Sequence, residues 1–311
     1  MSRTKLTATA VAIVLLMAGC SKEENQSTPQ KDNERALKVT GGIQALARAH
    51  DAMWESDDAI GIYMFATGST TLSEGSENRK YITTTGDGAF GPATTPTDQT
   101  IYFPIVGKTD FVAYYPWQSI TKDAEDKYLY AIDVSTQTTQ KDIDLMAAAK
   151  VSEKDKDNTN VAFEFTHKLV KISLTEIKHG DGLTADDLLG LTIKLTGQHT
   201  KATYDVVGGG EVSVDTTEPK GEIELLVADG SQSAEAIVLP AASTEGMELI
   251  FTLTNGEVYR WALSNAAQSL AFAAAHKYSY KITVSKKGLH VSSTITDWVS
   301  GNGEGEEGTA E

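Results

Sequence analysis

The sequence predicts an all-β protein made of β-sandwiches, and three observations predict it. Apolar or small residues alternate with polar ones in many short segments, as at Leu37, Val39, Gly41 and Ile43. A period of two indicates strands with one buried face. Turn-forming residues separate these segments at short intervals, while helical periodicity is scarce. Many short strands joined by regular turns are typical of β-sandwiches.

The first predicted strand is Ala36–Ala47, with Lys38, Thr40 and Gln44 on its polar face. Later strands are predicted at residues 59–65, 80–84, 100–103, 110–115, 128–134, 145–150, 161–165, 169–174, 191–195, 202–206, 211–214, 222–226, 234–239, 249–253, 258–263, 278–284 and 289–295. Glycine-rich hairpin turns are expected at residues 208–210 and 255–256. Single helical turns are expected at residues 184–189, capped by Thr184, and at 264–269.

The N-terminus carries a secretory signal pattern. Arg3 and Lys5 precede an apolar run, and Leu16-Met-Ala-Gly-Cys20 closes that run with small residues before the chain's single cysteine. This layout resembles a bacterial lipoprotein signal, which implies cleavage before Cys20 and acylation there. The alternatives are a plain signal peptide or a transmembrane span, but a span needs about 20 apolar residues and this run is shorter. Several acyl chains on Cys20 would anchor the protein in a membrane.

The chain divides into five predicted regions. A lipoprotein signal peptide at residues 1–19 precedes a flexible, lipidated tether at 20–35. A charged break at residues 151–160 suggests a boundary, which separates an N-terminal β-sandwich at 36–158 from a C-terminal one at 159–298. The acidic, glycine-rich residues 299–311 are expected to be disordered. The tether's start, Ser21-Lys-Glu-Glu24, resembles an export signal to the outer face of the outer membrane, or is an ordinary solvated linker.

Composition excludes several classes of partner and chemistry. The net charge of −16 disfavours nucleic acid and bare anionic membrane as partners. Once Cys20 is acylated no thiol remains, so disulfides, cysteine zinc sites and cysteine nucleophiles are not expected. The six histidines lack metal-site spacing, and no catalytic motif is complete. We therefore predict no enzyme, no catalytic residue, no metal and no cofactor, although sequence does not measure carboxylate separations.

Several segments together resemble the fimbrillin family of Bacteroidetes, the subunits of type V pili. They are, in order, Trp54-Glu-Ser-Asp-Asp-Ala-Ile-Gly-Ile-Tyr-Met64, Ile101-Tyr-Phe-Pro104, Phe111-Val-Ala-Tyr-Tyr-Pro116, Asp144-Leu-Met146, Phe163-Glu-Phe-Thr-His-Lys-Leu169, Ala236-Ile-Val-Leu-Pro240 and Ile295-Thr-Asp-Trp298. Residues 56–57 are Ser-Asp where the family commonly has Gly-Asp. The resemblance implies two tandem transthyretin-like β-sandwiches in a lipidated fimbrial subunit at the surface of the outer membrane.

The resemblance also implies maturation by a trypsin-like protease that cuts after an arginine near the first strand. That strand is expected at the edge of its sandwich, and its removal exposes unpaired N–H and C=O groups beside an apolar groove. A strand of a neighbouring subunit, self or related, then fills the groove. The candidate strand carries Leu37, Val39 and Ile43, and Arg35 and Arg48 flank it. A cut after Arg48 would release the strand, whereas a cut after Arg35 would keep it. We expect the cut after Arg48; alternatively, this is simply the first strand, and its flanking arginines are solvated ends.

A donor strand is also needed. Leu289, Val291 and Ile295 alternate with polar residues near the C-terminus, so this segment either fills a neighbour's groove or completes its own domain. The polar residues after it depart from a long donor tail, which leaves shaft, tip and anchor roles open. Tyr114, Tyr115 and Trp117 are expected to be buried; if exposed, they would offer a sugar-stacking platform. The alternative function is accordingly a non-polymerising surface lipoprotein that binds host or bacterial glycans.

Overall fold

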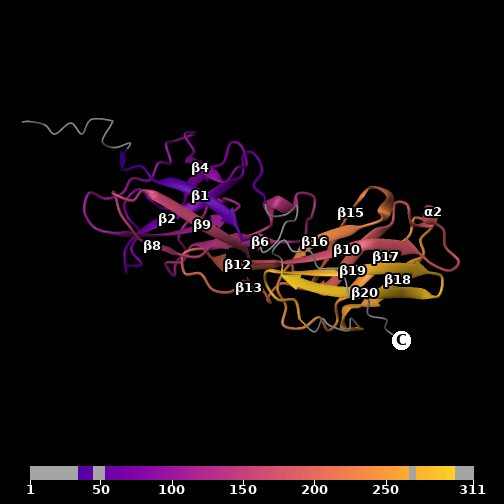
Figure 1. Cartoon of the computed structure of the whole chain (residues 1–311). Coiled ribbons are helices and arrows are strands. Elements are labelled where there is room, and N and C mark those ends of the chain that lie inside the picture. The colour runs from indigo at the N-terminus through magenta and orange to yellow at the C-terminus, as the bar shows by residue number, and fades with distance from the viewer. Residues whose placement is uncertain (1–33, 45–52, 266–270, 298–311) are drawn as a thin grey trace, which may run out of the picture.

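A computed structural model describes residues 34–44, 53–265 and 271–297 of the chain, and this part is almost entirely β-structure. Figure 1 shows an elongated molecule, with the N-terminal strands in indigo and magenta at one end and the C-terminal strands in orange and yellow at the other. The predicted all-β class is therefore confirmed. Among the described residues, no helix has the length and apolar character needed to cross a bilayer.

The N-terminal half is a single sheet that closes on itself. Its strands, in sheet order, are β2 (Ala59–Ala66), β3 (Arg79–Ile82), β4 (Ala89–Pro92), β1 (Lys38–Ile43), β9 (Asn160–His167), β7 (Met146–Ala148), β5 (Thr109–Tyr115) and β8 (Val151–Lys154). Because β2 also pairs with β5, the strands from β2 to β5 form a closed ring, and β8 extends from β5. Phe103, Phe111 and Phe163 are fully buried in the core of this ring.

The C-terminal half contains two sheets that share one core. The first is β15 (Leu226–Val227), β16 (Ala234–Val238), β10 (Val170–His179), β19 (His276–Ser285) and β20 (Gly288–Asp297). The second is β14 (Gly221–Glu224), β11 (Thr192–Gln198), β17 (Glu248–Thr252) and β18 (Val258–Ala262). Ile172 and Tyr280 of the first sheet lie in the same buried cluster as Ile193 and Phe251 of the second. Apolar and polar side chains alternate along each strand, so each sheet has one apolar face, and the apolar faces of the two sheets meet in this core.

A third sheet joins the halves. It consists of β13 (Ser213–Val214), β12 (Lys201–Asp205) and β6 (Leu129–Asp133), and it lies between the two ends of the molecule in Figure 1. Tyr130 of β6 packs edge-on against Tyr114 of β5, with ring centres 5.6 Å apart. The outer face of the ring thereby belongs to the same buried cluster as the C-terminal sheets. The core inside the ring is a separate buried cluster, so the described residues have two: one within the ring, and one that runs from the outer face of the ring into the C-terminal half.

The boundary between the N-terminal and C-terminal halves lies after residue 158, between β9 and β10. Strand β9 follows the expected boundary, yet it pairs with β1 and β7 inside the N-terminal sheet. The next strand, β10, is the first to pair with C-terminal strands. The charged segment 151–160 does not break the N-terminal sheet, because β8 pairs there with β5. Strongly polar composition misled the prediction, since β8 is a short strand whose side chains are mainly solvated.

Helical segments are few and short in the described residues. The expected helical turn is α2 (Ala185–Leu188), where the Thr184 N–H donates to the Asp187 carboxylate at 2.7 Å. Three short 3₁₀ segments are η1 (Gln140–Asp142), η2 (Asp229–Ser231) and η3 (Leu263–Asn265). The two predicted hairpins are confirmed, since β12 pairs with β13 and β17 with β18. Residues 100–103 form only an isolated bridge, and the short strand β4 was not expected.

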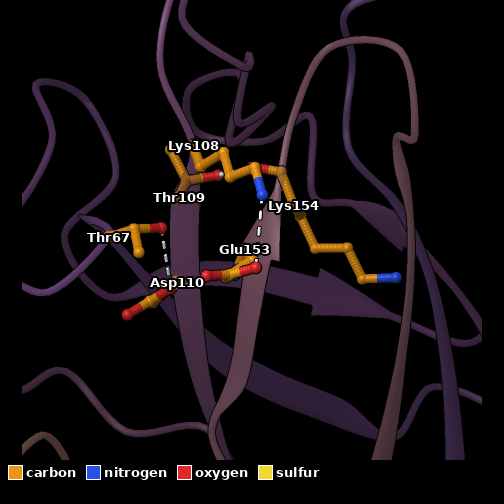
Figure 2. Close-up of polar contacts among 6 residues, drawn as sticks. All are labelled: Thr67, Lys108, Thr109, Asp110, Glu153 and Lys154. Carbon is orange, nitrogen blue, oxygen red and sulfur yellow. Dashed lines mark hydrogen bonds and ion pairs between the residues drawn. The ribbon is translucent and has the colours of Figure 1, made fainter.

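A buried carboxylate fastens the ring where β2, β5 and β8 meet. The Asp110 side chain, only 3% exposed, accepts hydrogen bonds from the Thr67 hydroxyl (2.9 Å) and from the Glu153 N–H (3.0 Å), and Lys150 Nζ lies 3.0 Å away. Figure 2 shows Asp110 between Thr67 and the strand that carries Glu153. Burial alone would raise the pKa of Asp110, but these donors together hold that pKa well below the ordinary range.

Candidate strand-exchange site

The first strand of the chain lies inside the ring rather than at an edge. All six residues of β1, Lys38–Ile43, pair in parallel with β9, from Lys38 opposite Asn160 to Ile43 opposite Phe165. On the other side, Val39 and Thr40 pair with β4 in antiparallel orientation. The expectation of an edge strand is therefore wrong. Because the N–H and C=O groups of a strand alternate between its two sides, β1 is hydrogen-bonded on both of them, along its whole length by β9 and over Val39 and Thr40 by β4.

Backbone hydrogen bonds extend this pairing beyond both ends of β1. The Leu37 N–H donates to Ile101 at 2.9 Å, and the Gln44 N–H donates to Phe165 at 2.9 Å. In the middle, the Gly41 N–H donates to the Gly88 carbonyl at 2.8 Å. Removal of β1 would thus leave unpaired groups along both β4 and β9.

Alternate side chains of β1 and of the residue before it fill the ring. Leu37 and Val39 are each 4% exposed and belong to the ring's core, and Ile43 packs against that core from a partly buried position. Lys38 and Thr40 point to solvent. Burial of a leucine or valine side chain contributes about 1.5–3 kcal/mol. The departure of β1 would therefore open a slot whose walls are apolar.

Of the two arginines that flank this strand, Arg35 lies among the described residues. The Arg35 guanidinium donates to the Phe103 carbonyl at 2.9 Å, and the Arg35 carbonyl accepts from the Phe103 N–H at 3.0 Å. Arg35 is thus tied to a neighbouring segment by both its side chain and its backbone. Arg48 and Cys20 lie outside the described residues.

The C-terminal candidate strand completes its own sheet. β20 pairs with β19 in an unbroken antiparallel ladder from Gly288 to Asp297. Leu289, Val291 and Ile295 are partly buried and pack against the C-terminal core. β20 is the last strand of its sheet, so one of its edges carries no partner strand among the described residues.

The aromatic group near Pro116 is mainly internal. Tyr114 and Tyr115 are buried, as expected, and Trp117 is half-buried with Lys80 Nζ 4.8 Å from its ring centre. The Tyr115 hydroxyl donates to the Asp58 carboxylate at 3.0 Å. Burial, and after it the nearby Asp58 charge, raises the pKa of Tyr115. These rings support the core and do not form an exposed stacking platform.

A small hollow beside the end of β1 carries charged groups that are paired. Its volume is about 230 Å³, and Ile43, Trp54 and Tyr115 contribute to its wall. Lys141 pairs with Glu55 at 2.9 Å on this wall, and Lys171 pairs with Glu235 at 3.1 Å. In the described ranges, no three or more histidine, cysteine or acidic side chains gather as a metal ion would require.

Three residues that surround β1 were not predicted as parts of the site. Trp54, Phe90 and Phe165 are buried and lie against the middle of β1. The sequence signal for Phe165 was its place in an alternating apolar segment. Phe90 lies on β4, a strand too short to give a clear alternation. For Trp54, the only sequence signal was its place in segment 54–64, which resembles the fimbrillin family.

Comparison with known proteins assigns the family. Residues 47–298 match the family described as fimbrillin-like. The chain belongs to the fimbrillin-like family. It is 48% identical over 308 residues, 97% of each chain, to a Bacteroides uniformis protein named "Putative fimbrium subunit Fim1C". The family consists of fimbrial subunits rather than enzymes, and subunits of this kind belong to a cell-surface appendage.

Solved structures agree with the fold. A crystal structure of a "putative cell adhesion protein" from Bacteroides uniformis is 48% identical, with a TM-score of 0.74 over 85% of this chain and 97% of that one. A similarly described protein from Bacteroides ovatus is 23% identical, with a TM-score of 0.68 over 86% of this chain and 99% of that one. At that lower identity the likeness concerns the fold alone.

Proposed function

We propose that the protein is a structural or accessory subunit of an adhesive fimbria, assembled by strand exchange after proteolytic removal of β1. The observation that carries the proposal is the position of β1. The first strand of the chain is also an interior strand of a closed ring, so its loss opens a slot with an unpaired strand on each side. An incoming strand would restore both ladders and refill the core with alternate side chains.

Strand exchange would require the protease because β1 is covalently attached to the subunit that it fills. While β1 remains part of the chain, its effective concentration at the slot is in the millimolar range or above. After a cut the strand can dissociate, and a neighbour's strand competes on equal terms. The family match starts at residue 47, four residues after the end of β1, so it does not include β1; this supports a mature subunit that lacks the strand.

We place the cut after Arg48 rather than after Arg35. A cut after Arg48 would release β1 together with everything before it, including a lipid-bearing Cys20. A cut after Arg35 would leave β1 in its slot, and the hydrogen bonds of Arg35 to Phe103 occupy the side chain and the carbonyl that a trypsin-like protease would have to bind. The proposal includes a lipoprotein signal at residues 1–19, an outer-membrane anchor at Cys20, and two transthyretin-like β-sandwiches.

The donor in this proposal is a strand of another fimbrial subunit. One candidate is β20 of a second copy, whose Leu289, Val291 and Ile295 would enter the slot vacated by Leu37, Val39 and Ile43. The other candidate is a strand of a related subunit, since β20 already fills a place in its own sheet. Binding of host or bacterial surface ligands by the assembled fimbria belongs to the same proposal.

Electron microscopy of the protease-treated protein tests this function, with two arginine variants as a matched pair. The wild type and Arg35→Ala should be cut by a trypsin-like protease and should form fibres, alone or with a related subunit. Arg48→Ala should stay uncut and monomeric. If Arg48→Ala polymerises as the wild type does, maturation at Arg48 is wrong. In cells, Cys20→Ala should remove incorporated palmitate and release the protein from the outer membrane.

A further inference from the structure

The middle of β1 has no room for a side chain. A Cβ atom added at Gly41 would lie 2.9 Å from Cε2 of Phe90 and 3.1 Å from Cε2 of Phe165. Folded proteins essentially never show contacts as short as the first of these, so a ring would have to move. Gly41 lies inside a regular ladder, opposite Phe163 of β9. The need for glycine here is therefore one of space, not of an unusual backbone conformation.

The two rings are themselves held in place. Trp54 packs edge-on against Phe90, with centres 5.0 Å apart, and against Phe165, with centres 5.2 Å apart. Tyr115 contacts the same indole at 5.3 Å. All four aromatic residues are less than 10% exposed. Because well-packed cores resist added volume, a side chain at Gly41 would strain the whole cluster.

Trp54 also binds the backbone of β1 at the same point. Its indole N–H donates to the Gly41 carbonyl at 2.7 Å, in a buried position. Pairing between β1 and β4 ends with Thr40 opposite Ala89. Beyond this pair, the Gly41 N–H still donates to the Gly88 carbonyl, which lies just before β4. The indole thus replaces the missing strand partner of the Gly41 carbonyl. A buried carbonyl without a donor is costly, so this contact fixes where the strand can sit.

We infer that Trp54, Phe90 and Phe165 form an aromatic clamp that sets the register of any strand in the β1 slot by requiring glycine at the Gly41 position. That another strand enters the slot rests on the proposed function; the clamp itself does not. The strand that fits has apolar residues at the Leu37, Val39 and Ile43 positions and glycine between the last two. A shift by two residues would put a large side chain against Phe90 and Phe165.

The clamp discriminates between the two donor candidates. The inward positions of β1 are Leu37, Val39, Gly41 and Ile43, whereas the same positions of β20 are Leu289, Val291, Ser293 and Ile295. The two sets agree except at the clamp, where β20 offers serine. The partner assigned by this geometry is accordingly a related subunit whose strand carries glycine there, in preference to a second copy of this chain.

Two glycine variants of the full, uncut chain test the clamp. Gly41→Val and Gly42→Val change neighbouring residues of one strand in the same way, but a Cβ at Gly42 meets only the mobile carboxylate of Glu164, at 3.0 Å. We expect the melting temperature of Gly41→Val to lie about 5 °C below that of Gly42→Val. If Gly41→Val does not fold, Gly41→Ala is compared with Gly42→Ala. Equal melting temperatures within a pair would overturn the clamp.

Labelled peptides then test selection by the slot in the protease-treated full chain. A peptide of residues 36–44 and its Gly42→Val form should bind. Its Gly41→Val form and a peptide of residues 288–297 should bind at least about tenfold more weakly. Equal binding of the 36–44 and 288–297 peptides would overturn the preference for a related subunit. If none of the peptides binds, strand exchange fails as a function, while the melting temperatures still decide whether the clamp exists.

Discussion

Strands β1 and β20 have nearly the same apolar pattern, yet the fold uses them differently. β1 has six residues and a neighbour on each side, and the side chains of Val39 and of Leu37, the residue before β1, are each 4% exposed. β20 has ten residues, one neighbour, and apolar side chains that are only partly buried. Loss of β1 would open the middle of a closed sheet, whereas loss of β20 would shift an edge inward by one strand. In the proposed assembly, removal of β1 would therefore create the slot, whereas β20 is more exposed but carries Ser293 where β1 has Gly41.

The largest expected effect separates these two environments directly. Val39→Asp would bury a charge among apolar side chains, which we expect to lower the free energy of unfolding by about 3–5 kcal/mol. Val291→Asp places the same charge on the edge strand, where water reaches it, and should cost about 1–2 kcal/mol. Denaturant unfolding of both variants measures the difference. Equal losses would show that β20 is as firmly enclosed as β1.

An intermediate effect is expected at the junction of β2, β5 and β8, the part of the ring that would have to stay folded after the loss of β1. Asp110→Asn removes the charge that joins β2, β5 and β8, and should cost about 2–3 kcal/mol at pH 7. The folded pKa of Asp110 is lowered, so its contribution is complete above the ordinary value of 3.8 and is lost as the pH falls below it. The difference in melting temperature between wild type and variant should therefore shrink below pH 3.8.

The matched control for that experiment is Glu153→Gln. It makes the same acid-to-amide change on β8 but removes only a 3.2 Å ion pair with Lys108 whose two side chains are more than half exposed. An exposed pair of this kind contributes at most about 1 kcal/mol. A loss in Glu153→Gln as large as that in Asp110→Asn would argue against a special role for the buried carboxylate.

Alternation in the sequence was enough to predict the strands but not their neighbours. The phase of β1 was clear, because Leu37 and Val39 alternate with Lys38 and Thr40, and these residues do point inward and outward. Whether a strand is at an edge depends on segments far away in the chain, here β9, which pairs with β1 from about 120 residues later. The same limit applies to segment 151–160, where charged residues suggest a domain boundary although β8 pairs there with β5.

The surroundings of the site were harder to predict than the strand itself. The need for glycine at Gly41 arises from Phe90 and Phe165, which come from two different strands, and from Trp54, which precedes a third. No local pattern contains all of them. A glycine within an alternating strand was the one available sign, since such a residue often marks a close approach of another group.

The smallest expected effect tests how β1 is held at its centre. Trp54→Phe keeps a ring in the core but removes the donor to the Gly41 carbonyl, which should cost about 1–2 kcal/mol. Trp117→Phe is the matched control, because its indole also donates to a backbone carbonyl, that of Asn78, but at 3.3 Å and near the surface. Hydrogen exchange should accelerate in β1 of Trp54→Phe and stay unchanged in β20. Equal exchange of β1 in the two variants would mean that the ladders to β4 and β9, rather than the indole, hold the strand.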